Sequence, residues 1–125
     1  MTVVDSSAWL HYFKGTDRAE SVAPYVEGSD ALVPSVVVYE VYKVLRRDVS
    51  EDAADRAAAW LSQQTVVPLD ERLALHAADV SLALRLPMAD AVVYATAQVH
   101  EAPVVTSDKH FVDLPGVEYI SEERE

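Results

Sequence analysis

The segment Thr2-Val3-Val4-Asp5 combines a short, β-branched apolar run with an acidic residue directly after it. Near the other end of the chain, Val104-Val105-Thr106-Ser107-Asp108 has a similar order. Short runs of this kind are typical of strands that are buried on both faces. Parallel strands end at one edge of their sheet, where such proteins bind ligands, so we expect both Asp5 and Asp108 at that edge.

Three further apolar runs, at residues 31–33, 65–67 and 117–120, also have the length and composition of strands. Segments with helical periodicity separate them, most clearly the stripe Leu73, Ala77, Val80 and Leu84. Short buried strands that alternate with helices predict an α/β sandwich with a mainly parallel sheet. In the first helix, Ser6 or Ser7 is expected to act as the N-cap.

The composition excludes several classes of protein. A chain of 125 residues, half of them hydrophobic, fits one compact domain over residues 1–125. The absence of cysteine excludes disulfides, thiolate metal sites and cysteine nucleophiles. No apolar run approaches the roughly 20 residues that cross a bilayer, and no signal-peptide pattern is present. We therefore expect a cytoplasmic protein without a membrane partner.

Two further acids have mostly apolar neighbours at helical spacing. The positions three and four residues away from Glu40 hold three valines and Lys43, and those around Asp90 hold Leu, Pro, Val and Tyr. An ionised carboxylate on an apolar face costs free energy unless it is paired or binds a metal. Lys43 could pair with Glu40, and His110 or an arginine could pair with Asp90. Each acid alone is therefore compatible with a structural role.

Taken together, Asp5, Glu40, Asp90 and Asp108 indicate a metal site. Carboxylates that converge repel one another, which raises their pKa values, and a bound Mg²⁺ or Mn²⁺ removes this conflict. No spacing of Cys or His residues offers a zinc site, and the scattered histidines are given no ligand role. The alternative for Asp5 and Asp108 is that each caps a following helix.

Four segments in this order resemble the PIN domain of VapC-like ribonuclease toxins, which belong to toxin–antitoxin pairs. The last two are followed by similar residues at 94–97 and 114–117. The resemblance extends over almost the whole chain. The segments are Val3-Val4-Asp5-Ser6-Ser7, Pro34-Ser35-Val36-Val37-Val38-Tyr39-Glu40-Val41, Leu86-Pro87-Met88-Ala89-Asp90-Ala91 and Val105-Thr106-Ser107-Asp108-Lys109-His110-Phe111.

The resemblance implies a PIN-like three-layer α/β/α sandwich, with a mainly parallel sheet of four to five short strands. It also implies metal-dependent cleavage of phosphodiester bonds in RNA. The residues that match the family's acidic positions are Asp5, Glu40, Asp90 and Asp108, and those that match its supporting hydroxyl positions are Thr106 and Ser6. Many relatives carry another acid near His110. This chain has no acid at that position, and Asp113, which could partly substitute for it, lies farther along the chain. We therefore predict one metal ion.

In this interpretation Asp5, Asp90 and Asp108 hold one Mg²⁺ or Mn²⁺, while Glu40 orients the attacking water or helps to bind a second ion. The resemblance also implies three partners: an RNA substrate such as transfer or ribosomal RNA, a cognate antitoxin and a second copy in a homodimer. Four aromatic residues could line an antitoxin groove, although core positions are the alternative for them. They are Trp9, Tyr12, Phe13 and Tyr42.

The formal net charge of −11 argues against a broad basic surface for nucleic acid. A divalent cation can supply positive charge at the phosphate instead, and a salty cytoplasm would also tolerate an acidic surface. The adjacent pair Arg46 and Arg47 is the favoured phosphate contact. Weaker candidates are Lys14, Arg18 and Lys43, for which a solvated helix face is the alternative.

Three other functions remain open at this stage. A structure-specific DNA nuclease would use the same acids, but no DNA clamp is visible in so short a chain. A degenerate PIN-type module would bind RNA or protein without cutting it. A receiver-like domain would need a phosphorylatable Asp after a middle strand, and the runs at residues 32–33 and 66–67 lack a suitable one, apart from Asp70.

Overall fold

The computed structural model describes residues 1–28 and 30–121. The last four residues of the predicted domain lie outside this range. Five strands form one sheet in the order β3-β2-β1-β4-β5, and every neighbouring pair is parallel. This confirms the predicted strands. They are β1 (Thr2–Val4), β2 (Ala31–Pro34), β3 (Thr65–Val67), β4 (Val104–Thr106) and β5 (Val117–Tyr119).

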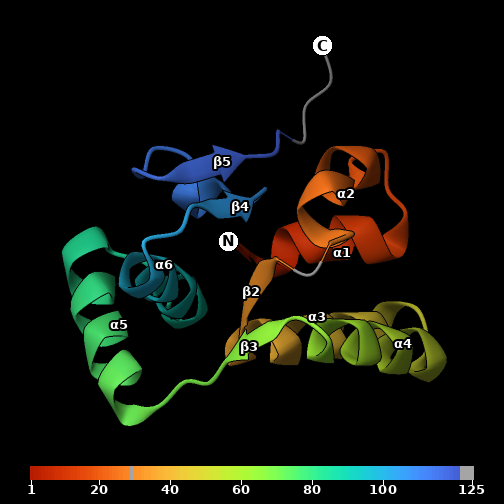
Figure 1. The fold of residues 1–125 in the computed structure, drawn as a ribbon, viewed down its shortest axis with the longest axis horizontal. Coiled ribbons are helices and arrows are strands. Elements are labelled where there is room, and N and C mark those ends of the chain that lie inside the picture. The colour runs from red at the N-terminus through yellow and green to blue at the C-terminus, as the bar shows by residue number, and fades with distance from the viewer. Residues whose placement is uncertain (29, 122–125) are drawn as a thin grey trace.

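Helices cover both faces of the sheet, as the α/β/α prediction requires (Figure 1). The pairs α1–α2 and α3–α4 lie on one side, and α5–α6 lies on the other. Within the described residues the helices are α1 (Ser6–Lys14), α2 (Ala19–Val26), α3 (Ser35–Asp48), α4 (Glu51–Ser62), α5 (Glu71–Leu84) and α6 (Met88–His100), with a short 3₁₀ helix η1 (Lys109–Phe111).

The strand order places a switch point beside β1. From β1 the chain adds β2 and β3 on one side, then crosses back to add β4 and β5 on the other. Val4 pairs with Val105, and the amide of Asp5 continues the ladder with a 2.9 Å bond to the Val105 carbonyl. The residues that follow β1 and β4 therefore meet where ligand sites form in open parallel sheets.

The core explains why such short strands are stable. The side chains of Val3, Val4 and Val105 are fully buried, and burial of one such side chain contributes about 1.5–3 kcal/mol. Trp9 is also fully buried and stacks on Phe13 at 5.5 Å between ring centroids. The expectation that Trp9 lines an exposed groove is therefore wrong, and its alternative as a core residue is correct.

The start of α1 differs from the expected capping arrangement. Asp5, not a serine, occupies the N-cap position, and its side chain makes no capping hydrogen bond. The serines Ser6 and Ser7 are the first residues of the helix, and their hydroxyls contact acidic side chains instead. Capping was a reasonable prediction from sequence, but long-range contacts determine the direction of these hydroxyls.

In the part of the chain that the structure describes, no single helix has the length and apolar character needed to cross a membrane. Only α5 and α6 meet those criteria when taken together, and they are bent by 111° at the break between them.

Candidate active site

Asp5 lies at the bottom of the site, with only 2% of its surface exposed. Its Oδ2 accepts hydrogen bonds from Thr106 Oγ1 at 2.9 Å and Ser7 Oγ at 3.0 Å. Thr106 Oγ1 also accepts the amide of Asp108 at 2.9 Å. One hydroxyl at the end of β4 therefore links the two acids that follow β1 and β4, and it fixes the direction of the Asp5 carboxylate.

Glu40 approaches from α3 and is held by Ser6, whose Oγ donates to Glu40 Oε1 at 3.1 Å. Burial raises the Glu40 pKa, and so do the charges of Asp5 and Asp108. Lys43 lies over the ring of Tyr39 at 5.5 Å, and no ion pair between Lys43 and Glu40 occurs among the described residues. The alternative in which Lys43 forms an ion pair with Glu40 is therefore not observed among the described residues.

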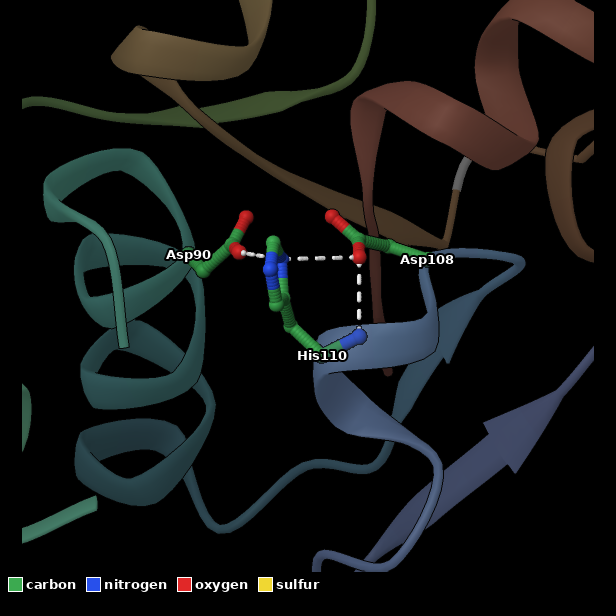
Figure 2. A group of neighbouring side chains, drawn as sticks. All are labelled: Asp90, Asp108 and His110. Atoms are coloured by element: carbon green, nitrogen blue, oxygen red, sulfur yellow. Dashed lines mark hydrogen bonds and ion pairs between the residues drawn. The ribbon is translucent and has the colours of Figure 1, made fainter. Parts of the chain in front are cut away.

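Asp90, Asp108 and His110 form the open side of the site (Figure 2). His110 Nδ1 lies 2.8 Å from Asp90 Oδ2 and 3.0 Å from Asp108 Oδ1. One candidate ligand atom from each of the three residues lies within 4.8 Å of the others. Asp108 Oδ1 also accepts the His110 amide at 2.9 Å, so Asp108 caps η1 and faces the cluster at once.

The acids of the site repel one another, and His110 is the basic side chain that pairs with Asp90 and Asp108. Burial, together with the charges of Asp108 and Asp5, raises the pKa of Asp90 to about 7, although His110 acts in the opposite direction. Burial also raises the Asp5 pKa, despite the hydrogen bonds from Thr106 and Ser7. The charges of Asp108 and Asp90 raise the pKa of His110. Burial and mutual repulsion thus favour the protonated form of Asp90, and a divalent cation would favour its ionised form.

The spacing of the donor atoms fits a cation. In an octahedral Mg²⁺ or Mn²⁺ site with bonds of about 2.1 Å, neighbouring ligand atoms are about 3 Å apart. The distances from His110 Nδ1 to the oxygens of Asp90 and Asp108 have this value. Asp5 is not part of this three-residue group, although its charge contributes to the raised pKa of Asp90. An imidazole ligand suits Mn²⁺ better than Mg²⁺, which prefers oxygen.

The sequence also matches the model of a known protein family. The model of the PIN domain family matches residues 2–117. The chain belongs to the PIN domain family. A search of curated proteins gives no match.

Solved structures agree with the PIN domain fold. A toxin–antitoxin complex from Klebsiella pneumoniae contains a chain with a TM-score of 0.82 and 20% identity, with 98% of this chain and 100% of that chain covered. VapC20 from Mycobacterium tuberculosis, described as a sarcin–ricin loop cleaving toxin, gives 0.78 and 19%, with 97% and 100% covered. PAE2754 from Pyrobaculum aerophilum gives 0.72 and 21%, with 95% and 90% covered. At these identities the likeness establishes the fold.

The favoured basic pair lies away from the acids of this PIN domain. Arg46 pairs with Glu51 at 3.1 Å and Arg47 with Asp48 at 2.7 Å, and both arginine side chains are at least half exposed. They lie on the last turn of α3, about 9 Å along the helix axis from Glu40.

Asp113, considered as a substitute acid, is exposed and is not part of the three-residue cluster with His110. Two residues that contact the acids, His110 and Ser7, have no such role in the sequence prediction. From sequence, His110 is expected only as a partner for Asp90, yet it bridges two acids with the spacing of metal ligands. From sequence, Ser7 is expected only as a helix cap, yet its hydroxyl contacts Asp5 and Thr106 and accepts the Ser107 amide. For His110, the position two residues after an acidic strand end was a usable signal. For Ser7, no signal in the sequence distinguished it from a helix cap.

Proposed function

We propose that this PIN domain is a Mg²⁺- or Mn²⁺-dependent endoribonuclease and the toxin of a toxin–antitoxin pair. The observation that carries the proposal is the cluster of Asp90, Asp108 and His110 at the sheet edge, with the charge of buried Asp5 acting on Asp90. Acids gathered in this way are stable as ions only around added positive charge, and a scissile phosphate requires the same charge.

Each residue of the proposed site has a separate role that depends on its position. Asp5, Asp90 and Asp108 would hold the ion, and His110, after losing its proton, would be a further ligand in place of the acid that many relatives carry. When bound, a divalent cation lowers the pKa of water and offsets charge on the phosphate. Glu40, held by Ser6, accepts a proton from the attacking water and directs it in line. Thr106 and Ser7 keep Asp5 fixed.

The proposed substrate is a single-stranded loop of transfer or ribosomal RNA. Unstacked strands admit a metal ion and carboxylates to a phosphate more readily than a stiff duplex does. VapC20, which shares the fold, is described as cleaving the sarcin–ricin loop, so a ribosomal loop is the first substrate to test.

The proposed protein partners are an antitoxin and a second copy of the chain, in the cytoplasm. A cavity of about 620 Å³ lies between α1, α3 and α4, with Tyr12, Phe13 and Trp60 in its walls. An apolar helix face from an antitoxin would fit such a groove. Tyr42 does not line it and hydrogen-bonds to Asp55 at 3.4 Å. The toxin–antitoxin complex from Klebsiella pneumoniae contains a chain of the same fold, which supports this partner class.

The test is cleavage of an RNA loop with Mn²⁺, with and without EDTA, by the wild-type chain, Asp90→Asn and Asp113→Asn. We expect EDTA and Asp90→Asn to abolish cleavage. The matched control Asp113→Asn, which removes a charge from an exposed acid near the site, should cleave normally. Cleavage by Asp90→Asn at the wild-type rate would refute the mechanism, and RNA binding without cleavage would favour the non-catalytic module.

A further inference from the structure

Arg18, the residue before α2, is a buried cation with unused hydrogen-bond donors. Only 9% of its surface is exposed. Its Nε and Nη2 atoms are inaccessible and have no hydrogen-bond partner, and no ion pair of Arg18 occurs among the described residues. A buried charge without a partner costs several kcal/mol as an order of magnitude, so such an arginine is unusual unless a ligand completes it.

The Arg18 side chain lines a cavity of about 310 Å³ together with Ser21 of α2 and with Tyr119, Ile120 and Ser121. In Figure 1, the end of β5 (blue) points toward α2 (orange). The cavity therefore lies where the carboxyl end of β5 meets the start of α2, and Ser21 contributes a hydroxyl to its wall.

This cavity shares the sheet edge with the acid cluster. The amide of Ile120, which lines the cavity, donates to the carbonyl of Thr106 at 2.7 Å. The side chain of the same Thr106 donates to Asp5. One residue of β4 is thus in contact with both places, so an extended ligand lying along the carboxyl edge of the sheet can reach both.

Other bases of the chain differ from Arg18 in exposure and pairing. Arg47 pairs with Asp48, and Arg56 pairs with Asp52 at 3.0 Å with both side chains more than 70% exposed. These arginines are solvated and neutralised, whereas Arg18 is neither. In a chain with a net charge of −11, this base has no ion-pair partner among the described residues. Since Nε and Nη2 are inaccessible to solvent, the guanidinium group has to turn toward the cavity before these two donors can bind an anion.

We propose that Arg18 and its cavity bind a backbone phosphate of the RNA strand, next to the phosphate that the acid cluster cleaves. The inference rests on the proposed function and adds a substrate-binding subsite to it. A guanidinium group suits phosphate oxygens because its N–H donors form a planar fork. The subsite holds the strand in position and takes no part in the chemistry, so its loss raises KM and leaves kcat nearly unchanged.

The first experiment measures binding of a labelled single-stranded RNA oligonucleotide by fluorescence anisotropy, over a range of salt concentrations. The proteins are Asp90→Asn, which prevents cleavage, and the same protein with Arg18→Gln, Arg18→Lys or Arg56→Gln. Arg56→Gln is the matched control, because it removes the same charge from an exposed helix.

We expect Arg18→Gln to weaken RNA binding about tenfold, within the range for charge-assisted hydrogen bonds. The slope of log K against log salt should fall by about 0.7, the value for one phosphate contact on a single strand. Arg18→Lys should recover part of the slope, and Arg56→Gln should change neither quantity. An unchanged affinity and slope in Arg18→Gln would overturn the subsite.

The second experiment does not depend on RNA or on the variants. The wild-type, metal-free chain is titrated with inorganic phosphate at constant ionic strength, and the Nε–H resonance of Arg18 is followed by NMR. We expect a saturable shift with phosphate and a much smaller one with acetate. An equal response to acetate would overturn the proposal in favour of a carboxylate from an acidic protein segment, and no response to phosphate would also overturn it.

The two experiments separate this inference from the proposed function. A chain that cleaves RNA, with wild-type KM and salt slope in Arg18→Gln, retains the function and loses the subsite. A phosphate response at Arg18 in a chain that neither binds nor cleaves RNA retains the anion site and removes the nuclease.

Discussion

The two ends of helix α3 carry charged residues in opposite situations. Near its start, Glu40 lies beside Asp5 and Asp108, where burial raises the Glu40 pKa. At its end, Arg47 holds Asp48 at 2.7 Å on the surface and lowers the Asp48 pKa to about 2. At the C-terminal end of α3, Asp48 is paired with a base of the chain. Around Glu40, in contrast, most of the nearby charges are negative. We infer that a ligand must bring positive charge to the acids around Glu40.

The largest expected effect concerns the buried acid. Asp5→Asn should reduce Mn²⁺-dependent RNA cleavage at least about 100-fold, since even residues behind metal ligands change activity by 10–100-fold. Thr106 and Ser7 can still donate to the amide oxygen of the variant, so circular dichroism should report an intact fold. The comparison variant Asp48→Asn, at the opposite end of α3, should retain full activity. Equal activity in both variants would remove the distinction between the two regions.

The affinity for Mn²⁺ should depend steeply on pH. Asp90, with a pKa of about 7, is ionised above that pH and protonated below it. At pH 5.5 the ion must displace this proton, so the affinity measured by calorimetry should be at least about tenfold lower than at pH 8. The raised His110 pKa acts in the same direction. An affinity that is constant over this range would show that Asp90 does not bind the metal.

A smaller effect is expected on the stability of the metal-free chain. The pKa of Asp90 in the folded state, about 7, lies above its ordinary value of 3.8, so the folded state binds more protons between these values. Stability therefore falls as pH rises from about 4 to 7. Asp90→Asn removes this penalty and should stabilise the chain at pH 8 by about 1 kcal/mol, after allowance for solvent screening.

Thermal melting in EDTA measures this effect, which corresponds to about 3–5 °C for a chain of this size. The gain should shrink at pH 5, where Asp90 is protonated in the wild-type chain. A gain of the same size at both pH values would point to a cause other than its charge.

The smallest expected effect concerns stability and the exposed ion pair between Arg47 and Asp48. Arg47→Ala should change the melting temperature by less than about 2 °C, because exposed ion pairs contribute little and salt screens them. A larger loss would mean that the end of α3 depends on its ion pairs, and the contrast between the two ends would weaken.

The fold and the acid positions were accessible from sequence for definite physical reasons. Short β-branched runs between helices leave few alternatives to a parallel sheet, and an acid directly after a strand has to lie at its carboxyl edge. The apolar neighbours of Glu40 and Asp90 likewise signalled an unusual environment. These signals are local in the chain.

The features that escaped prediction depend on contacts between distant segments. The position of His110 between Asp90 and Asp108 requires α6 and η1 to approach each other. The burial of Arg18 requires α2 to pack near the end of β5. Neither follows from spacing or composition, and for this reason the sequence favoured Arg46 and Arg47 over Arg18.

The hydrogen bond between Thr106 and Asp5 joins residues that are 101 positions apart in the chain. Closing so long a loop before its contacts form is slow compared with forming a local helix. The acid cluster is therefore completed late, when β4 adds beside β1, and a nascent chain that ends before residue 104 lacks Thr106 and Asp108. For a proposed toxin this order of assembly has a protective consequence, because a fragment released before residue 104 during interrupted synthesis lacks part of the proposed centre.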